Sequence, residues 1–154
     1  MKETERITDL MQRTFYGPAW HGPAVMELLN DLPANEAAQR PLGQIHSIWE
    51  LVLHLATWKE VARWRIAKNE RVPTEEENFP AVTDSSEAAW KAAKDKLTSA
   101  HEDLRRAIAA LPEEGLNEEI PAGGELTHFV RLHGVIQHDL YHAGQIALLK
   151  KLQN

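Results

Sequence analysis

Cysteine is absent from the 154 residues of this chain. Without thiols there are no disulfides, no thiolate metal ligands and no cysteine nucleophiles, so a metal site would have to use nitrogen and oxygen ligands. No apolar run approaches the roughly 20 residues that span a bilayer, and no signal-peptide core follows Met1. We therefore expect a cytoplasmic protein that has no membrane partner.

Basic residues are in the minority, because 17 Lys and Arg face 23 Asp and Glu and leave a formal net charge of −6. Domains that bind nucleic acid are typically basic, so nucleic acid is not expected as a partner. Hydrophobic residues make up 43% and charged residues 26% of the chain, as in an ordinary globular protein. This length is enough to bury a core, and we expect a single domain over residues 1–154.

Helical periodicity runs through the chain, and neither a strand signal nor an internal repeat accompanies it. The pattern predicts four long helices and one short extra helix, over about residues 4–15, 24–30, 41–69, 86–111 and 127–152. Pro41 is expected near the start of the second long helix. Asp84 or Ser85 is expected to cap the third, and Thr127 the fourth. These elements indicate an all-α protein with a four-helix bundle.

Four connections separate the five predicted helices, and the one over residues 32–40 is expected to be a polar connection. Two Gly-Pro steps within residues 17–23 form a stiff loop that presents Trp20 and His21, as a hydrophobic plug over one end of the bundle or as the rim of a site. Residues 71–86 are expected to cross the bundle or form a lid.

Phe79 is the expected anchor of that crossing segment. The last connection, over residues 113–125, is expected to be loosest at Gly123 and Gly124.

Two histidines near the end of the chain carry the strongest functional signal. His138 and His142 are four residues apart, which on a helix places them on one face with Cβ atoms about 5–6 Å apart. Two such imidazoles can bind one ion, as in H-E-x-x-H metalloproteases. The glutamate of that motif is missing here, which excludes this class of metalloprotease. Apolar stripes on two sides of this helix predict that it is buried, where imidazoles need a shared acceptor such as a metal ion. Packed core histidines are the alternative.

His54 is the candidate for a third ligand. His46, Glu50, His54 and Trp58 follow one another at four-residue steps along the second long helix, beside apolar residues. Taken alone, His54 would also fit a hydrogen-bonded packing residue. Glu50, one turn earlier, is a candidate acceptor for a ligand imidazole or else a surface carboxylate.

Further polar residues surround these candidates. Tyr141 and Gln145 flank the histidine pair and could orient a substrate or satisfy the interior of the bundle. His21 is a weaker candidate that could approach the metal from its loop. His101 is expected at the surface. His128 and His133 are expected at the surface or at an interface.

Taken together, the motifs resemble the DinB/YfiT-like superfamily, named after damage-inducible proteins of bacilli and distinct from the polymerase of that name. The resemblance is carried by residues 46–58 (HSIWELVLHLATW), by residues 138–146 (HDLYHAGQI) and by the loop over residues 17–23 (GPAWHGP). It covers nearly the whole chain in the right order, and the combination is more specific than any one motif.

In that family one histidine of the second long helix and two of the last helix bind a divalent metal, which carries over to His54, His138 and His142. The resemblance also implies an up-down-down-up bundle and, commonly, a homodimer. Characterised relatives include transferases and isomerases that use low-molecular-weight thiols such as bacillithiol and mycothiol. The resemblance therefore implies a metal-dependent S-transferase acting on a small-molecule substrate, with such a thiol as candidate cosubstrate.

Three imidazoles without a fourth protein ligand leave positions open for water or substrate, which is typical of catalytic sites. Nitrogen ligands suit zinc, nickel, iron or copper, and we expect zinc first and nickel next. The alternative enzyme is a metal-dependent hydrolase, in which a metal-bound water attacks an electrophile. Two non-catalytic alternatives also stay open: a regulatory metal-binding bundle, and a bundle whose ion only holds its helices together.

Overall fold

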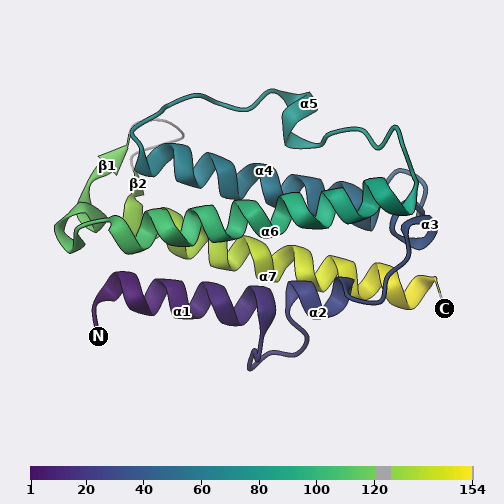
Figure 1. The fold of residues 1–154 in the computed structure, drawn as a ribbon, viewed down its shortest axis with the longest axis horizontal. Helices are drawn as coiled ribbons and strands as arrows, with labels where there is room; N and C mark the ends of the chain where they lie inside the picture. The colour runs from purple at the N-terminus through teal and green to yellow at the C-terminus, as the bar shows by residue number, and fades with distance from the viewer. Residues whose placement is uncertain (121–125, 154) are drawn as a thin grey trace.

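Four long helices form the body of the protein in a computed structural model that describes residues 1–120 and 126–153. They are α1 (Glu3–Tyr16), α4 (Ile48–Ile66), α6 (Glu87–Ala110) and α7 (His128–Leu152). Figure 1 shows that α1 and α7 run in one direction and that α4 and α6 run in the other. Both α1 and α4 contact both α6 and α7. The all-α class and the up-down-down-up bundle are confirmed.

Short elements connect these helices. They are α2 (Val25–Leu29), α3 (Ala34–Ala37), α5 (Glu75–Asn78), the 3-10 helix η1 (Glu113–Asn117) and the antiparallel strands β1 (Glu119–Ile120) and β2 (Leu126–Thr127). The short extra helix near the N-terminus is thus present as α2. The strands were not predicted, because two residues are too few to show a period of two. Gly123 and Gly124 lie outside the described residues.

The second long helix starts at Ile48 and not near Pro41. The hydroxyl of Ser47 accepts a hydrogen bond from the backbone N–H of Glu50, whose carboxylate in turn accepts one from the N–H of Ser47, at 3.2 and 2.8 Å. This capping box satisfies two N–H groups at the helix start and sets the boundary there. Ile45, which falls inside the predicted helix but before its observed start, is half exposed.

Side-chain caps also begin the last two long helices. Ser86 caps α6, since its hydroxyl accepts the N–H of Ala89 at 3.2 Å. Neither Asp84 nor Ser85, the two alternatives predicted, is the cap, and the carboxylate of Asp84 instead accepts the N–H of Ser86 at 2.9 Å. Thr127 caps α7 as predicted.

The loops differ in how closely they pack against the helices of the bundle. Trp20 is fully exposed, so the interpretation of its loop as a hydrophobic plug is wrong. The segment between α4 and α6 crosses the bundle, because α4 and α6 run in the same direction and the chain must return to the starting end (Figure 1). The crossing segment carries α5, which contacts α4. Among the described residues, no helix is both long and apolar enough to cross a membrane.

The core consists of two apolar clusters. The larger includes Phe15, Trp49 and Trp90, and the smaller includes Ile7 and Leu132. Along each long helix, the residues of one cluster come before those of the other. Buried polar side chains occupy the positions between them: Thr14 on α1, Lys59 on α4, His101 on α6 and Asp139 on α7.

Candidate metal centre

Three histidines from two antiparallel helices meet between α4 and α7. His54 lies in the first half of α4, and His138 and His142 lie one turn apart on α7. Nε2 of His138 is 3.0 Å from Nε2 of His54 and 2.9 Å from Nε2 of His142. All three ring nitrogens lie within 4.8 Å of one another, so the group could hold a metal ion. His54 and His142 are buried, and His138 is partly buried.

Hydrogen bonds on the far side of two rings orient these nitrogens. Nδ1 of His54 lies 2.9 Å from the carbonyl oxygen of Asn78, and Nδ1 of His142 lies 2.6 Å from the side-chain oxygen of Gln145. Since both partners are acceptors, each Nδ1 carries the hydrogen and each Nε2 presents a lone pair. The single hydrogen that Nε2 of His138 can hold satisfies only one of these lone pairs. A cation at the centre would satisfy all three, so the donor set fits a metal ion.

The protonation state of the cluster also suits a metal. Burial, followed by the charges of His142 and His54, lowers the pKa of His138 to about 3. Burial is also the largest influence on the other two rings and lowers the pKa of each, although the hydrogen bonds to Asn78 and Gln145 oppose it. All three rings are therefore neutral near pH 7, which is the form that binds metal ions.

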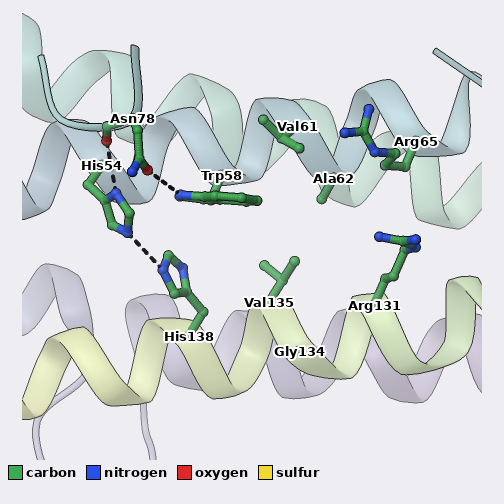
Figure 2. Close-up of a pocket in the computed structure, with 10 residues that line it drawn as sticks. All are labelled: His54, Trp58, Val61, Ala62, Arg65, Asn78, Arg131, Gly134, Val135 and His138. Carbon is green, nitrogen blue, oxygen red and sulfur yellow. Dashed lines mark hydrogen bonds between the residues drawn. The ribbon is translucent and has the colours of Figure 1, made fainter. Parts of the chain in front are cut away.

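The crossing segment covers one side of the cluster. The ring of Phe79 stacks on that of His54 at 4.1 Å and on that of His46 at 3.8 Å. The side chain of Asn78 accepts a hydrogen bond of 2.8 Å from the indole N–H of Trp58 (Figure 2). The segment thus holds His54 through a backbone carbonyl and an aromatic face. Sequence reasoning identified Phe79 as an anchor of the loop but missed its contact with a ligand candidate.

A buried ion pair joins the same two helices next to the cluster. Nζ of Lys59 on α4 lies 2.7 and 2.6 Å from the two carboxylate oxygens of Asp139 on α7, and both side chains are 1% exposed. Burial raises the pKa of Asp139, against the charge of Lys59. The pair ties α4 to α7 beside His138. The sequence offered one signal for it, namely charged residues at positions where the helices are otherwise apolar.

The other candidates lie at different distances from the cluster. Gln145 contacts a ligand candidate directly, whereas Tyr141 is 65% exposed with its ring centroid 5.0 Å from that of His142. Glu50 is buried but pairs with Arg40 and Ser47, and the acceptor for His54 is the carbonyl of Asn78 instead.

Burial raises the pKa of Glu50, but its hydrogen bonds to Arg40 and Ser47 outweigh that effect and lower it to about 2. The interpretation of Glu50 as an ordinary surface carboxylate is therefore wrong as well, since its carboxylate closes the cap of α4.

Several histidine predictions need correction. His101 was expected at the surface but is fully buried, with its ring stacked on Phe15 at 3.8 Å. Its acidic neighbours in sequence suggested a surface position, yet they point to other sides of α6. His128 is also buried, and His133 is partly exposed, with Nδ1 2.9 Å from a backbone carbonyl oxygen of its own helix. His21 is exposed and lines a separate hollow with Leu140, away from the cluster.

Two hollows reach the histidines. One of about 390 Å³ lies between α4 and α7 and is lined by His54 and His138 together with mainly apolar residues. The other, of about 520 Å³, includes all three histidines and opens past Tyr141 and Leu148. The cluster is therefore accessible to small molecules from two sides, as expected of a site where an ion keeps open positions.

Comparisons with known proteins agree with this architecture. A crystal structure of a conserved protein from Enterococcus faecalis is similar over 99% of this chain and 97% of that chain, with a TM-score of 0.73 and 19% sequence identity. At that identity the likeness concerns the fold alone. No curated protein matches the chain significantly. Residues 19–146, which include all three clustered histidines, match the family model of the DinB superfamily. The chain belongs to the DinB superfamily.

Proposed function

We propose that this protein binds a divalent transition metal through His54, His138 and His142 and catalyses a reaction of a small molecule there, with thiol-dependent S-transfer as the first candidate. The observation that carries the proposal is the convergence of three neutral imidazole nitrogens at 2.9 and 3.0 Å between two hollows. Because all three candidate ligands are nitrogen atoms, zinc is the first choice of metal and nickel the second. When bound, such an ion supplies Lewis-acid chemistry that favours the anionic form of a thiol or a water.

The chain's own residues would hold the reactants in place. The carbonyl of Asn78 and the side chain of Gln145 keep two imidazoles in one orientation, which preserves the geometry of the site during a reaction. The aromatic rings of Trp58 and Phe79 lie beside His54 and would shield reacting groups from water. Tyr141, exposed next to His142, would contact a substrate that enters through the larger hollow.

The linings of the hollows support thiol transfer ahead of hydrolysis. Imidazole, aromatic and aliphatic groups predominate among the residues that surround the histidines. A free thiol has a pKa of about 8.5 and needs little help to ionise at neutral pH. Activation of water usually relies on an additional carboxylate as general base, as in the H-E-x-x-H enzymes. A metal-dependent hydrolase therefore remains the second candidate.

A homodimer is part of this proposal. Leu42, Ile45 and Leu148 line the larger hollow and are each about half exposed, at 49, 50 and 57%. Burial of these side chains against a second copy would remove apolar surface from water. Light scattering in solution should give twice the 17.4 kDa mass of one chain, and a mass of one chain would contradict the dimer.

The first test is the metal content of protein purified without a histidine tag. We expect about one ion per chain in the wild type and none in His138→Ala, with the helical circular dichroism of both unchanged. His133→Ala is the matched control, since it removes a histidine of the same helix outside the cluster, and it should keep the ion. Only samples that bind metal should accelerate the reaction of a small thiol with a chromogenic electrophile.

Two results would contradict the proposal. A wild-type protein that holds no ion after incubation with zinc or nickel would leave a bundle with core histidines. A protein that unfolds when a chelator removes the ion would have a structural metal and not a catalytic one.

A further inference from the structure

The smaller hollow, of about 390 Å³, lies beside the histidine cluster between α4 and α7 (Figure 2). His54 and His138 line it where it reaches the cluster. The volume lies within the usual range of sites for small molecules. The residues next to these two histidines therefore decide which kind of molecule can lie against the proposed metal site.

Helix geometry places two residues of the lining directly beside the histidines. Trp58 follows His54 by four residues on α4. Gly134 precedes His138 by the same number of residues on α7. Four residues are about one helical turn, so each residue lies on the same face as its histidine and about 6 Å further along the helix axis. Because α4 and α7 are antiparallel, both steps lead from the cluster into the hollow (Figure 2).

Trp58 supplies an aromatic surface at this position. Its ring centroid lies 6.2 Å from that of His54 and 6.2 Å from that of His138. The indole N–H donates to the side-chain oxygen of Asn78 at 2.8 Å, which fixes the orientation of the ring. The residue is nevertheless 37% exposed, so the protein holds the indole in place without covering it. A ligand with an aromatic ring would gain a stacked or edge-to-face contact there.

Helix α7 leaves space on the side of the hollow that faces this indole (Figure 2). Gly134 has no side chain, and a Cβ atom placed on it would meet no other atom within 4 Å. Val61 on α4 and Val135 on α7 also line the hollow. The space between the indole and α7 is therefore bordered by aromatic and aliphatic groups, which favour the apolar part of a ligand.

The charged residues of the lining lie at the far end of the hollow. They are Arg65 and Arg131 (Figure 2). Nη1 of Arg65 donates to the backbone carbonyls of Asn69 and Arg71 at 2.6 and 2.8 Å. Arg131 likewise donates to two backbone carbonyls, at 2.7 and 3.3 Å. The chain itself thus holds both guanidinium groups, and recognition of a ligand next to the histidines depends on the apolar residues.

We propose that the smaller hollow binds an aromatic substrate, whose ring lies between the indole of Trp58 and the backbone of α7 at Gly134. A ring in this position is about one helical turn from His54 and from His138, and therefore next to the proposed metal site. The larger hollow then serves the thiol, so that the two reactants reach the cluster from different sides. The inference rests on the proposed function, for which it names the substrate class.

The test compares two ligands with the same carbon skeleton, 2-naphthalenemethanol and its saturated decahydro derivative, by titration calorimetry of the zinc-incubated protein. We expect the aromatic ligand to bind at least about threefold more tightly, because its flat rings can stack on the indole. Trp58→Leu should reduce this preference to less than about twofold, whereas Trp58→Phe should retain it, since phenylalanine keeps an aromatic surface. The matched control Trp20→Leu removes a fully exposed tryptophan outside the hollow and should leave the preference unchanged.

A second pair of variants tests the location from the opposite helix. Gly134→Leu should weaken binding of the aromatic ligand by about tenfold or more, since a leucine side chain would occupy the space proposed for the ring. Gly144→Leu makes the same change on an exposed part of α7, where a Cβ also meets nothing within 4 Å, and should have no effect. Equal binding of the two ligands, no binding of either, or equal effects of the two glycine variants would each overturn the inference.

Zinc content of the same samples separates this inference from the proposed function. If zinc is bound but the aromatic ligand has no advantage, the substrate class is wrong and the metal proposal stands. If the aromatic ligand is preferred by a protein that holds no zinc, the metal proposal fails and the hollow remains a site for aromatic molecules.

Discussion

The clustered histidines and the single histidine His101 all lie inside this bundle, but their surroundings differ. In the histidine cluster, three Nε2 atoms converge while Nδ1 of His54 and of His142 each has an acceptor. His101 on α6 is fully buried, but among the described residues neither of its ring nitrogens has a hydrogen-bond partner. Burial, with the charges of Lys59 and Arg105, lowers its pKa to about 2. Burial therefore keeps both groups neutral, but only convergence of the nitrogen atoms creates a possible metal site.

The comparison extends to how each polar group is compensated. Lys59 and Asp139 lie between the two apolar clusters and neutralise each other across α4 and α7. In the histidine cluster, the one hydrogen on Nε2 of His138 can serve His54 or His142 but not both, so one lone pair lacks such a partner. A buried polar group whose hydrogen-bond and charge partners all lie within the protein stabilises the fold. A buried polar group that lacks such a partner is suited to bind a ligand.

Removal of one partner of the buried ion pair should have the largest effect. Asp139→Asn would leave the ammonium of Lys59 buried without its counter-charge, and we expect the metal-free protein to lose about 3–5 kcal/mol of unfolding free energy in urea. The double variant Lys59→Met, Asp139→Leu should recover most of this loss, because it removes both charges. A loss below about 1 kcal/mol in the single variant would show that the ion pair contributes little to the stability of the fold.

Loss of the hydrogen-bond acceptor for Nδ1 of His142 should weaken zinc binding, an effect of intermediate size. Gln145→Ala leaves His142 without its hydrogen bond, and we expect zinc affinity in competition with a chelator to fall about 10- to 100-fold. Gln137→Ala is the matched control, an exposed glutamine of the same helix, and its affinity should equal that of the wild type. Equal affinities in all three proteins would mean that Gln145 does not orient the ring.

Because His101 is buried in its neutral form, it should make the free energy of unfolding depend on pH. Its pKa of about 2 in the folded protein lies far below the value near 6.5 of an unfolded histidine. The unfolded state therefore takes up a proton that the folded state does not, and stability falls as the pH drops below about 6.5. Between pH 7 and pH 5 this group should contribute a loss of about 2 kcal/mol in the metal-free protein.

The variant His101→Phe should abolish that part of the loss and keep the stacking on Phe15. His21→Phe changes an exposed histidine and serves as control. If the unfolding free energies of wild type and His101→Phe decline equally between pH 7 and pH 5, the buried ring is not responsible.

Much of this protein followed from local sequence patterns. Periodicity predicted the four long helices, Thr127 was recognised as a cap, and the four-residue spacing of His138 and His142 placed both on one face of α7. These features depend on the geometry of a single helix. The start of the second helix was misplaced, because Pro41 suggested an early start while the capping box of Ser47 and Glu50 decided the boundary.

The sequence by itself determined which side chains share a helical face, since 3.6 residues per turn leave little choice. Only the tertiary structure decided which faces meet. The position of His54 on its helix made it the candidate third ligand, and the resemblance to a family supported that prediction. The contact of Asn78 and Phe79 with His54, the pairing of Lys59 with Asp139 and the burial of His101 depend instead on how the helices pack. Residues 24 to 84 positions apart meet there, and the packing that joins them is a property of the whole core.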